Sequence, residues 1–107
     1  MSFIKGLKSY SAFLYPCEND TGGRINLYCE DQHRLYLIFQ NSGSSPSANT
    51  YDASDQTGVA YRPISHYEHY IDLIRNEAPI WVTFNPDSAP PSYAVHCGAE
   101  PPGDGEM

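Results

Sequence analysis

The stretch RINLYCEDQHRLYLIF, residues 24–39, decides the fold. Apolar side chains recur at every second position on either side of a polar break: Ile25, Leu27, Cys29, Leu35, Leu37 and Phe39. This period of two is typical of strands with one buried face. The break, Asp31-Gln32-His33, is short enough for a hairpin turn. The stretch therefore predicts an antiparallel hairpin that turns Tyr28, Tyr36 and Ile38 to the face opposite the leucines.

Strand patterns continue on both sides of this hairpin. Further strands are predicted at residues 3–15, 59–64, 80–84 and 93–97, the last pairing back onto the one before it. Pro16 ends the first strand, and the composition of residues 18–23 indicates a turn. Residues 41–58 are rich in Ser, Asn and Asp. A connection of this length is usually functional or mobile, so we expect a long loop there.

One helix is expected, from about residue 65 to about residue 77. Ser65 and Glu68 have the spacing of a capping box, and Pro79 forces the helix to end. An apolar stripe with helical spacing should face the core: Tyr67, Tyr70, Ile71 and Ile74. The predicted fold is therefore α+β, an antiparallel sheet of about five to six strands in the order β-β-β-loop-β-α-β-β with one helix on one face. Residues 1–97 should form a single domain, and residues 98–107 a flexible acidic Gly/Pro tail.

The charge balance favours some partners over others. The chain of 107 residues has a formal net charge of −7. Its basic residues are scattered along the sequence: Lys5, Lys8, Arg24, Arg34, Arg62 and Arg75. A duplex-binding surface needs clustered basic side chains, so we expect no nucleic-acid or membrane partner. No apolar run approaches the length of a membrane span, and no leader segment is recognised, so we expect a soluble cytoplasmic protein.

Motifs for metal binding and catalysis are incomplete. His66 and His69 are three residues apart on the expected helix, whereas His96 and Cys97 should point to opposite faces of a strand, so we expect no metal site and no cofactor. Asp20-Thr21-Gly22 is the tripeptide of aspartic proteases, but the apolar residues that should precede it are missing, which favours a turn. The thiols of Cys17, Cys29 and Cys97 are expected to be free, and no pattern pairs any of them with a base. An enzyme is therefore the less favoured class.

Aromatic residues are the most distinctive feature, since the chain has 9 tyrosines. Tyr28, Tyr36 and Trp81 should lie on the sheet face that the single helix leaves open. We therefore expect a protein-binding or regulatory module, which meets a partner or a second copy of itself through this aromatic face. The alternative is a small-molecule site, possibly enzymatic, under the loop at 41–58, with candidate residues Tyr51, Asp52, Asp55, Arg62 and His96.

Overall fold

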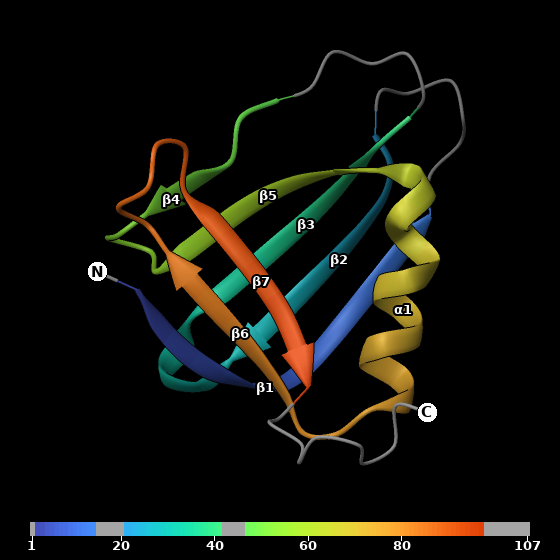
Figure 1. The fold of residues 1–107 in the computed structure, drawn as a ribbon, viewed down its shortest axis with the longest axis horizontal. Coiled ribbons are helices and arrows are strands. Elements are labelled where there is room, and N and C mark those ends of the chain that lie inside the picture. The colour runs from blue at the N-terminus through green and yellow to red at the C-terminus, as the bar shows by residue number, and fades with distance from the viewer. Residues whose placement is uncertain (1, 15–20, 42–46, 98–107) are drawn as a thin grey trace, which may run out of the picture.

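The structure, a computed structural model, describes residues 2–14, 21–41 and 47–97. In chain order its elements are β1 (Phe3–Leu14), β2 (Thr21–Cys29), a 3₁₀ turn (Glu30–Gln32), β3 (Arg34–Gln40), β4 (Thr50–Asp52), β5 (Thr57–Pro63), a 3₁₀ turn (Ile64–His66), α1 (Tyr67–Asn76), β6 (Ile80–Asn85) and β7 (Ser92–Cys97). The strands form one sheet in the order β4-β5-β3-β2-β1-β6-β7. This sheet curls into a half-barrel with α1 on its inner side (Figure 1).

The α+β class is confirmed, but the predicted sheet is wrong in two respects. It is 7-stranded, and it is mixed, because β3 and β5 run parallel with Tyr36 opposite Val59. A parallel neighbour requires a long crossover connection, and the polar segment after β3 supplies it. The short strand β4 lies inside that segment and forms an antiparallel hairpin with β5. The expectation of a strandless loop over residues 41–58 is therefore wrong at both β4 and the start of β5.

The central hairpin of β2 and β3 is confirmed. The strands are antiparallel with Leu27 opposite Leu35. In the turn, Asp31 and Gln32 adopt positive φ angles of 58° and 64°, and the Cys29 amide donates to the His33 carbonyl at 2.8 Å. β2 already begins at Thr21, so the turn predicted for residues 18–23 is wrong for its last part. Residues 18–20 lie outside the described chain.

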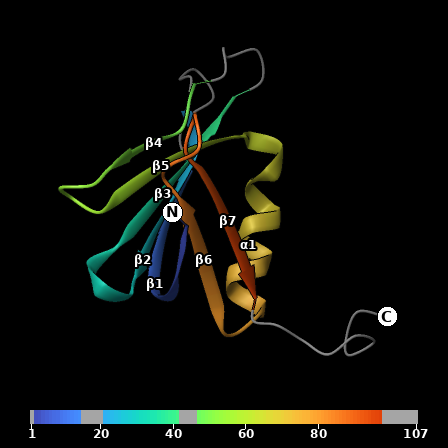
Figure 2. The ribbon, with the colours of Figure 1, turned by 60° about the vertical axis from the view of Figure 1, so that its left-hand side comes forward.

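β1 belongs to both walls of the half-barrel, one formed with β6 and β7 and the other with β2 and β3. Its first residues, Phe3 to Gly6, pair with β6, and its remainder, Leu7 to Leu14, pairs with β2. The register shifts between Leu7 and Ser9, which marks a bulge at the changeover. A bulge bends its strand and increases its twist. The turned view shows how the β6–β7 wall faces the β2–β3 wall as a result (Figure 2).

The hydrophobic core fills the concave side. Its largest fully buried side chains come from β2, β3 and β6: Ile25, Leu27, Leu35, Leu37, Phe39, Val82 and Phe84. Helix α1 packs on this side, with the rings of Tyr67 and Tyr70 set edgewise against Phe39 at centroid distances of 5.1 and 5.6 Å. The alternation read from the hairpin is therefore confirmed, because the leucine-rich face is the one that meets the helix.

The helix is confirmed within the expected error of its ends, but its predicted start signal is wrong. Ile74 is buried, and the rest of the apolar stripe packs half-buried against the core. α1 begins at Tyr67, and its N-cap position, His66, makes no capping hydrogen bond through its side chain. Ser65 lies within the preceding 3₁₀ turn, so it cannot act as the extended residue that a capping box requires. The helix ends at Asn76, ahead of Pro79 as expected.

Side-chain hydrogen bonds join the two ends of the curled sheet. The Tyr93 hydroxyl of β7 donates to the Thr50 carbonyl of β4. The Asn49 amide donates to the Pro91 carbonyl at 3.1 Å, and its oxygen accepts from the Tyr61 amide at 2.9 Å. We call this line of contacts the seam. Among the described strands no backbone ladder joins β4 to β7, and the seam keeps these two end strands of the sheet together.

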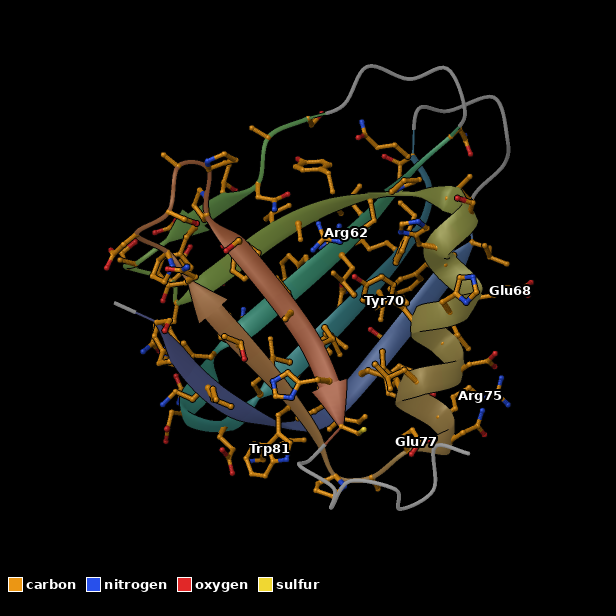
Figure 3. The ribbon with its side chains drawn as sticks, viewed as in Figure 1. Arg62, Glu68, Tyr70, Arg75, Glu77 and Trp81 are labelled. Atoms are coloured by element: carbon orange, nitrogen blue, oxygen red, sulfur yellow. The ribbon has the colours of Figure 1, made fainter. Side chains whose placement is uncertain are left out.

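Arg62 extends the seam toward the helix. Its Nε donates to the Tyr70 hydroxyl at 3.1 Å, and its Nη2 donates to the Tyr93 carbonyl at 3.3 Å. One half-buried guanidinium thus connects β5, α1 and β7 (Figure 3).

Within the described ranges, no helix is long and apolar enough to cross a membrane. The tail expected at residues 98–107 lies outside them.

Candidate functional site

The convex face of the sheet, opposite α1, is formed in its centre by β2, β3 and β5. The registers place Tyr36 between Asn26 and Val59, and Ile38 between Arg24 and Tyr61. All of these side chains except Asn26 are half-buried. We define the convex patch by its six half-buried members on the three strands: Arg24, Tyr28, Tyr36, Ile38, Val59 and Tyr61.

Arg24 organises this patch through contacts on both sides. Its guanidinium carbon lies 4.6 Å from the centroid of the Tyr36 ring, a cation–π arrangement. Its Nε donates to the Asn26 side-chain oxygen at 2.7 Å, and the Asn26 amide donates to the Tyr28 hydroxyl at 3.4 Å. The Ser11 hydroxyl lies 3.5 Å from that of Tyr28. These linked contacts favour one arrangement of the aromatic and cationic groups on this face.

The hydroxyl network also acts on the acidity of Tyr28. Hydrogen bonds from Ser11 and Asn26 hold the pKa of the Tyr28 phenol below its usual value, and the positive charges of Arg24 and Arg34 act in the same direction. Desolvation raises this pKa, and its influence is smaller than that of either hydrogen bond but larger than that of either arginine.

Charge on this face differs from that of the whole chain. Arg24 and Arg34 are the charged residues within β2 and β3, although the net charge of the chain is −7. Carboxylates gather instead in the two turns next to Arg34, at Glu30 and Asp31 after β2 and at Asp52 and Asp55 around the β4–β5 turn. The convex patch is thus aromatic and locally basic, with acids along one border.

The aromatic residues proposed from the sequence fall on two regions of the convex face. Tyr28 and Tyr36 lie within the convex patch. Trp81 lies on β6, opposite His96 of β7 and Gly6 of β1, at the lower edge of the view in Figure 3. The Glu30 carboxylate lies over Gly6 and accepts from its amide at 2.8 Å. A charged group therefore stands beside Trp81.

The residues proposed for a small-molecule site do not converge. The pairing of Tyr51 with Gly58 and of Arg62 with Phe39 puts both side chains on the concave face. His96 lies on the convex face of β7, where its Nε2 is 2.9 Å from the Thr83 hydroxyl. The sheet itself therefore separates Arg62 from His96.

Two acidic members of that proposed site serve the turn between β4 and β5. Asp52 accepts from the Ser54 hydroxyl at 2.7 Å and from the Ser54 amide at 3.0 Å. These hydrogen bonds hold the pKa of the Asp52 carboxyl below its usual value, with a further contribution from the amide of Asp55. This is the geometry of an Asx turn, in which an aspartate stabilises its own chain reversal.

Metal-binding and thiol residues are dispersed. The rings of His66 and His69 are 6.5 Å apart, and no group of three potential ligands occurs within the described ranges. Cys29 is buried among the core side chains, and burial, aided by the charge of Glu30, raises the pKa of its thiol to about 12. A thiol held in its protonated form is a poor nucleophile. Cys17 lies outside the described chain.

Sequence reasoning left out three members of the convex patch: Arg24, Val59 and Tyr61. The position of Arg24 was readable, because it has the same parity as Tyr28 in an alternating strand. Tyr61 joins the patch only because β5 lies parallel to β3, which places it beside Ile38. No pattern within residues 41–63 signals that pairing.

Comparisons with family models, curated proteins and solved structures find no match to this chain.

Proposed function

We propose that this domain is a protein-binding or regulatory module that contacts its partner through the convex patch. The observation that supports the proposal is a pre-organised aromatic surface on the uncovered side of the sheet, in which Arg24 stacks on Tyr36 and is linked to Tyr28 through Asn26. Tyrosine and arginine are enriched at protein interfaces, because they combine a large contact area with a polar end. Cytoplasmic placement is part of the proposal, supported by the free thiols of Cys29 and Cys97.

The patch favours a partner segment that carries carboxylates between apolar side chains. Tyr36, Ile38 and Tyr61 offer apolar contact area on adjacent strands. Arg24 and Arg34 lie beside them and would complement a negative group. Removal of water from such a contact strengthens the hydrogen bonds of a guanidinium to a carboxylate.

Capture from extract of the native cells with matched variants tests this proposal. Tyr36→Ala should weaken retention of the partner about 5- to 150-fold, the range for a hot spot of about 1–3 kcal/mol. Arg24→Ala should weaken it as well and reduce its dependence on salt, because a charge contact is lost. Asp72→Ala, on the exposed side of α1, serves as the control and should retain the partner fully.

Quantitative mass spectrometry of the retained proteins provides the measurement. A protein retained by the wild type and by Asp72→Ala, but depleted from Tyr36→Ala and Arg24→Ala, supports the proposal. If every retained protein binds the patch variants as well as the wild type, the convex patch is not the binding surface.

A further inference from the structure

Asn26 lies at the centre of the convex face and is buried among polar and aromatic side chains, with 9% of its surface exposed. Tyr36 lies opposite it on β3, and Ser11 lies opposite it on β1. On β2 itself, the Arg24 Nε donates to its oxygen at 2.7 Å, and its amide donates to the Tyr28 hydroxyl at 3.4 Å. Hydroxyl, amide and guanidinium groups from neighbouring strands therefore meet at one point of an aromatic surface.

Hydrogen-bond donors at this point remain available for a ligand. Arg24 uses its Nε on Asn26, and its two terminal nitrogens make no hydrogen bond or ion pair with any described residue. The exposed Arg34, which lies opposite Tyr28 in the register, makes none through its side chain either. The hydroxyls of Tyr28 and Ser11 are 3.5 Å apart and share one hydrogen bond at most, so at least one of their two protons is left to donate.

The carboxylates of the adjoining turn are engaged with other groups. Asp31 forms an ion pair with Lys5 at 2.7 Å, and the Glu30 carboxylate accepts from the Gly6 amide at 2.8 Å. Within the part of the chain that the structure describes, no carboxylate pairs with either arginine of the convex face. Two guanidinium groups thus keep their charge uncompensated on the surface of a chain with a net charge of −7.

The acidity of Tyr28 indicates the same preference for negative charge. The pKa of its phenol is lowered by hydrogen bonds with Ser11 and Asn26, with the charges of Arg24 and Arg34 as smaller contributions. An anionic group placed beside this hydroxyl would meet the same donors and the same two positive charges. This part of the convex face therefore favours an anion.

We propose that the partner bound by the convex patch carries a phosphorylated tyrosine, whose phosphate contacts Arg24, Tyr28 and Arg34. This inference rests on the proposed function, because it assigns one side chain of the partner segment. A phosphate monoester carries a charge of about −1.5 to −2 and three acceptor oxygens. It therefore matches two guanidinium groups and a hydroxyl better than a carboxylate does, with its single charge and two oxygens.

The surroundings of these donors favour an aromatic carrier on a protein segment. Tyr36 lies beside them, and Ile38 and Tyr61 continue the apolar surface onto β3 and β5. The ring of a phosphotyrosine and the apolar side chains next to it would contact this surface. A polyanion, such as a nucleic acid or an anionic membrane, would be repelled by the net charge of −7, whereas one phosphate meets the locally positive part of the face.

NMR titration with phenyl phosphate tests this site, because the probe has the ring and the charge of a phosphotyrosine side chain. The backbone amide signals of Asn26, Tyr28 and Arg34 should shift together, with a dissociation constant of about 1 mM, as expected for a small ligand on an open surface. Benzoate should bind about 5-fold more weakly or worse, because it carries one charge and two oxygens. Ethyl phosphate should bind about 3-fold more weakly or worse, because it lacks the ring.

Matched arginine variants locate the phosphate. Arg34→Gln should weaken the binding of phenyl phosphate about 5-fold or more, because a charge-assisted hydrogen bond is lost. Arg75→Gln removes the same charge from the exposed side of α1 and should bind the probe like the wild type (Figure 3). Tyr28→Phe removes a single hydroxyl and should weaken binding about 3-fold. The dispersion of the amide signals shows that each variant is folded.

Phosphatase treatment of the extract distinguishes this inference from the proposed function. Retention of the partner should fall about 5-fold or more after treatment and stay unchanged when the phosphatase is inhibited. If Tyr36→Ala depletes the partner but phosphatase does not, the proposed function stands and the phosphate is wrong. If neither Tyr36→Ala nor phosphatase reduces retention, both are wrong.

Three results of the titration would also overturn the inference. The first is the absence of amide shifts up to about 20 mM phenyl phosphate. The second is binding of benzoate or ethyl phosphate as tight as that of phenyl phosphate, which would show that the site does not select an aryl phosphate. The third is equal binding of the probe to Arg34→Gln and to the wild type, which would place the probe elsewhere.

Discussion

Gly58 and Tyr93 show how a single side chain shapes the interior of the half-barrel. Gly58 lies on the concave face of β5, opposite Leu35. A Cβ atom at this position would lie 2.5–2.6 Å from atoms of the Tyr93 ring, far inside van der Waals contact. The glycine therefore leaves the space through which Tyr93 reaches the Thr50 carbonyl and completes the seam.

Gly58→Ala should for this reason destabilise the protein by about 1–3 kcal/mol, the usual cost of overpacking a core. Urea unfolding of the variant measures this change in the free energy of unfolding. In the Tyr93→Leu background the same substitution should cost less, because the ring that it meets is gone. An equal loss in both backgrounds would show that the methyl group does not contact Tyr93.

The seam connects elements that the sequence places far apart, and it carries a titratable group. Tyr93 is largely buried, and burial, followed by the influence of Tyr51, raises the pKa of its phenol to about 12 from an ordinary value of 10.0. The Cys29 thiol in the core is shifted in the same direction, from 9.0 to about 12. At alkaline pH the folded chain therefore keeps a proton on each of these two groups that the unfolded chain has released.

Stability should therefore fall at alkaline pH. Below about pH 9 both groups are protonated in the folded and unfolded chains, so their contribution is fully present. As the pH rises from about 9 toward 12, the unfolded chain loses these protons first, and the free energy of unfolding decreases. Chemical denaturation at a series of pH values measures this decrease.

Matched substitutions assign the alkaline effect to these two groups. Cys29→Ala and Tyr93→Phe should each be less stable than the wild type at pH 7, through a lost core contact and a lost hydrogen bond respectively. Each should also show a shallower decline of stability above pH 9, because one titrating group is missing. A decline as steep as that of the wild type in both variants would contradict the assignment.

At the level of elements, the sequence was sufficient where local rules decide the outcome. The buried face predicted from the leucine alternation of β2 and β3 is the face that meets α1. The tyrosine stripe of α1 packs against the core as its spacing indicates. Ser65 and Glu68 matched a capping motif, but the 3₁₀ turn after Pro63 places Ser65 inside a helical turn. A motif of two residues carries no information on the backbone conformation of the residues before it.

The pairings of β4 with β5 and of β5 with β3 could not be predicted from the sequence. β4 is 3 residues long and lies among Ser, Asn and Asp, so it has no periodicity of its own. It forms because its turn is stabilised by Asp52 and because β5 offers it an edge. The parallel contact of β5 with β3 then adds Val59 and Tyr61 to the convex patch. About half of that patch was predictable, since Tyr28, Tyr36 and Ile38 follow from the hairpin alone.

For the whole molecule, the curl of the sheet separates two roles. The concave face, with α1, forms the core, while the convex face keeps Arg24 and the tyrosines accessible. A binding surface on rigid strands holds its geometry better than one on loops. This geometry supports the proposal that a partner binds through the convex patch.

Photochemical cross-linking tests whether a partner binds through the convex patch. A photoreactive phenylalanine analogue placed at Val59 or Tyr61 lies on the convex patch, and the same group at Asp72 lies on the exposed side of α1. After irradiation in extract of the native cells, a cross-linked product of one defined partner should form from both convex positions and not from residue 72. Cross-linking of that partner from residue 72, with none from residues 59 and 61, would show that the convex patch is not the binding surface.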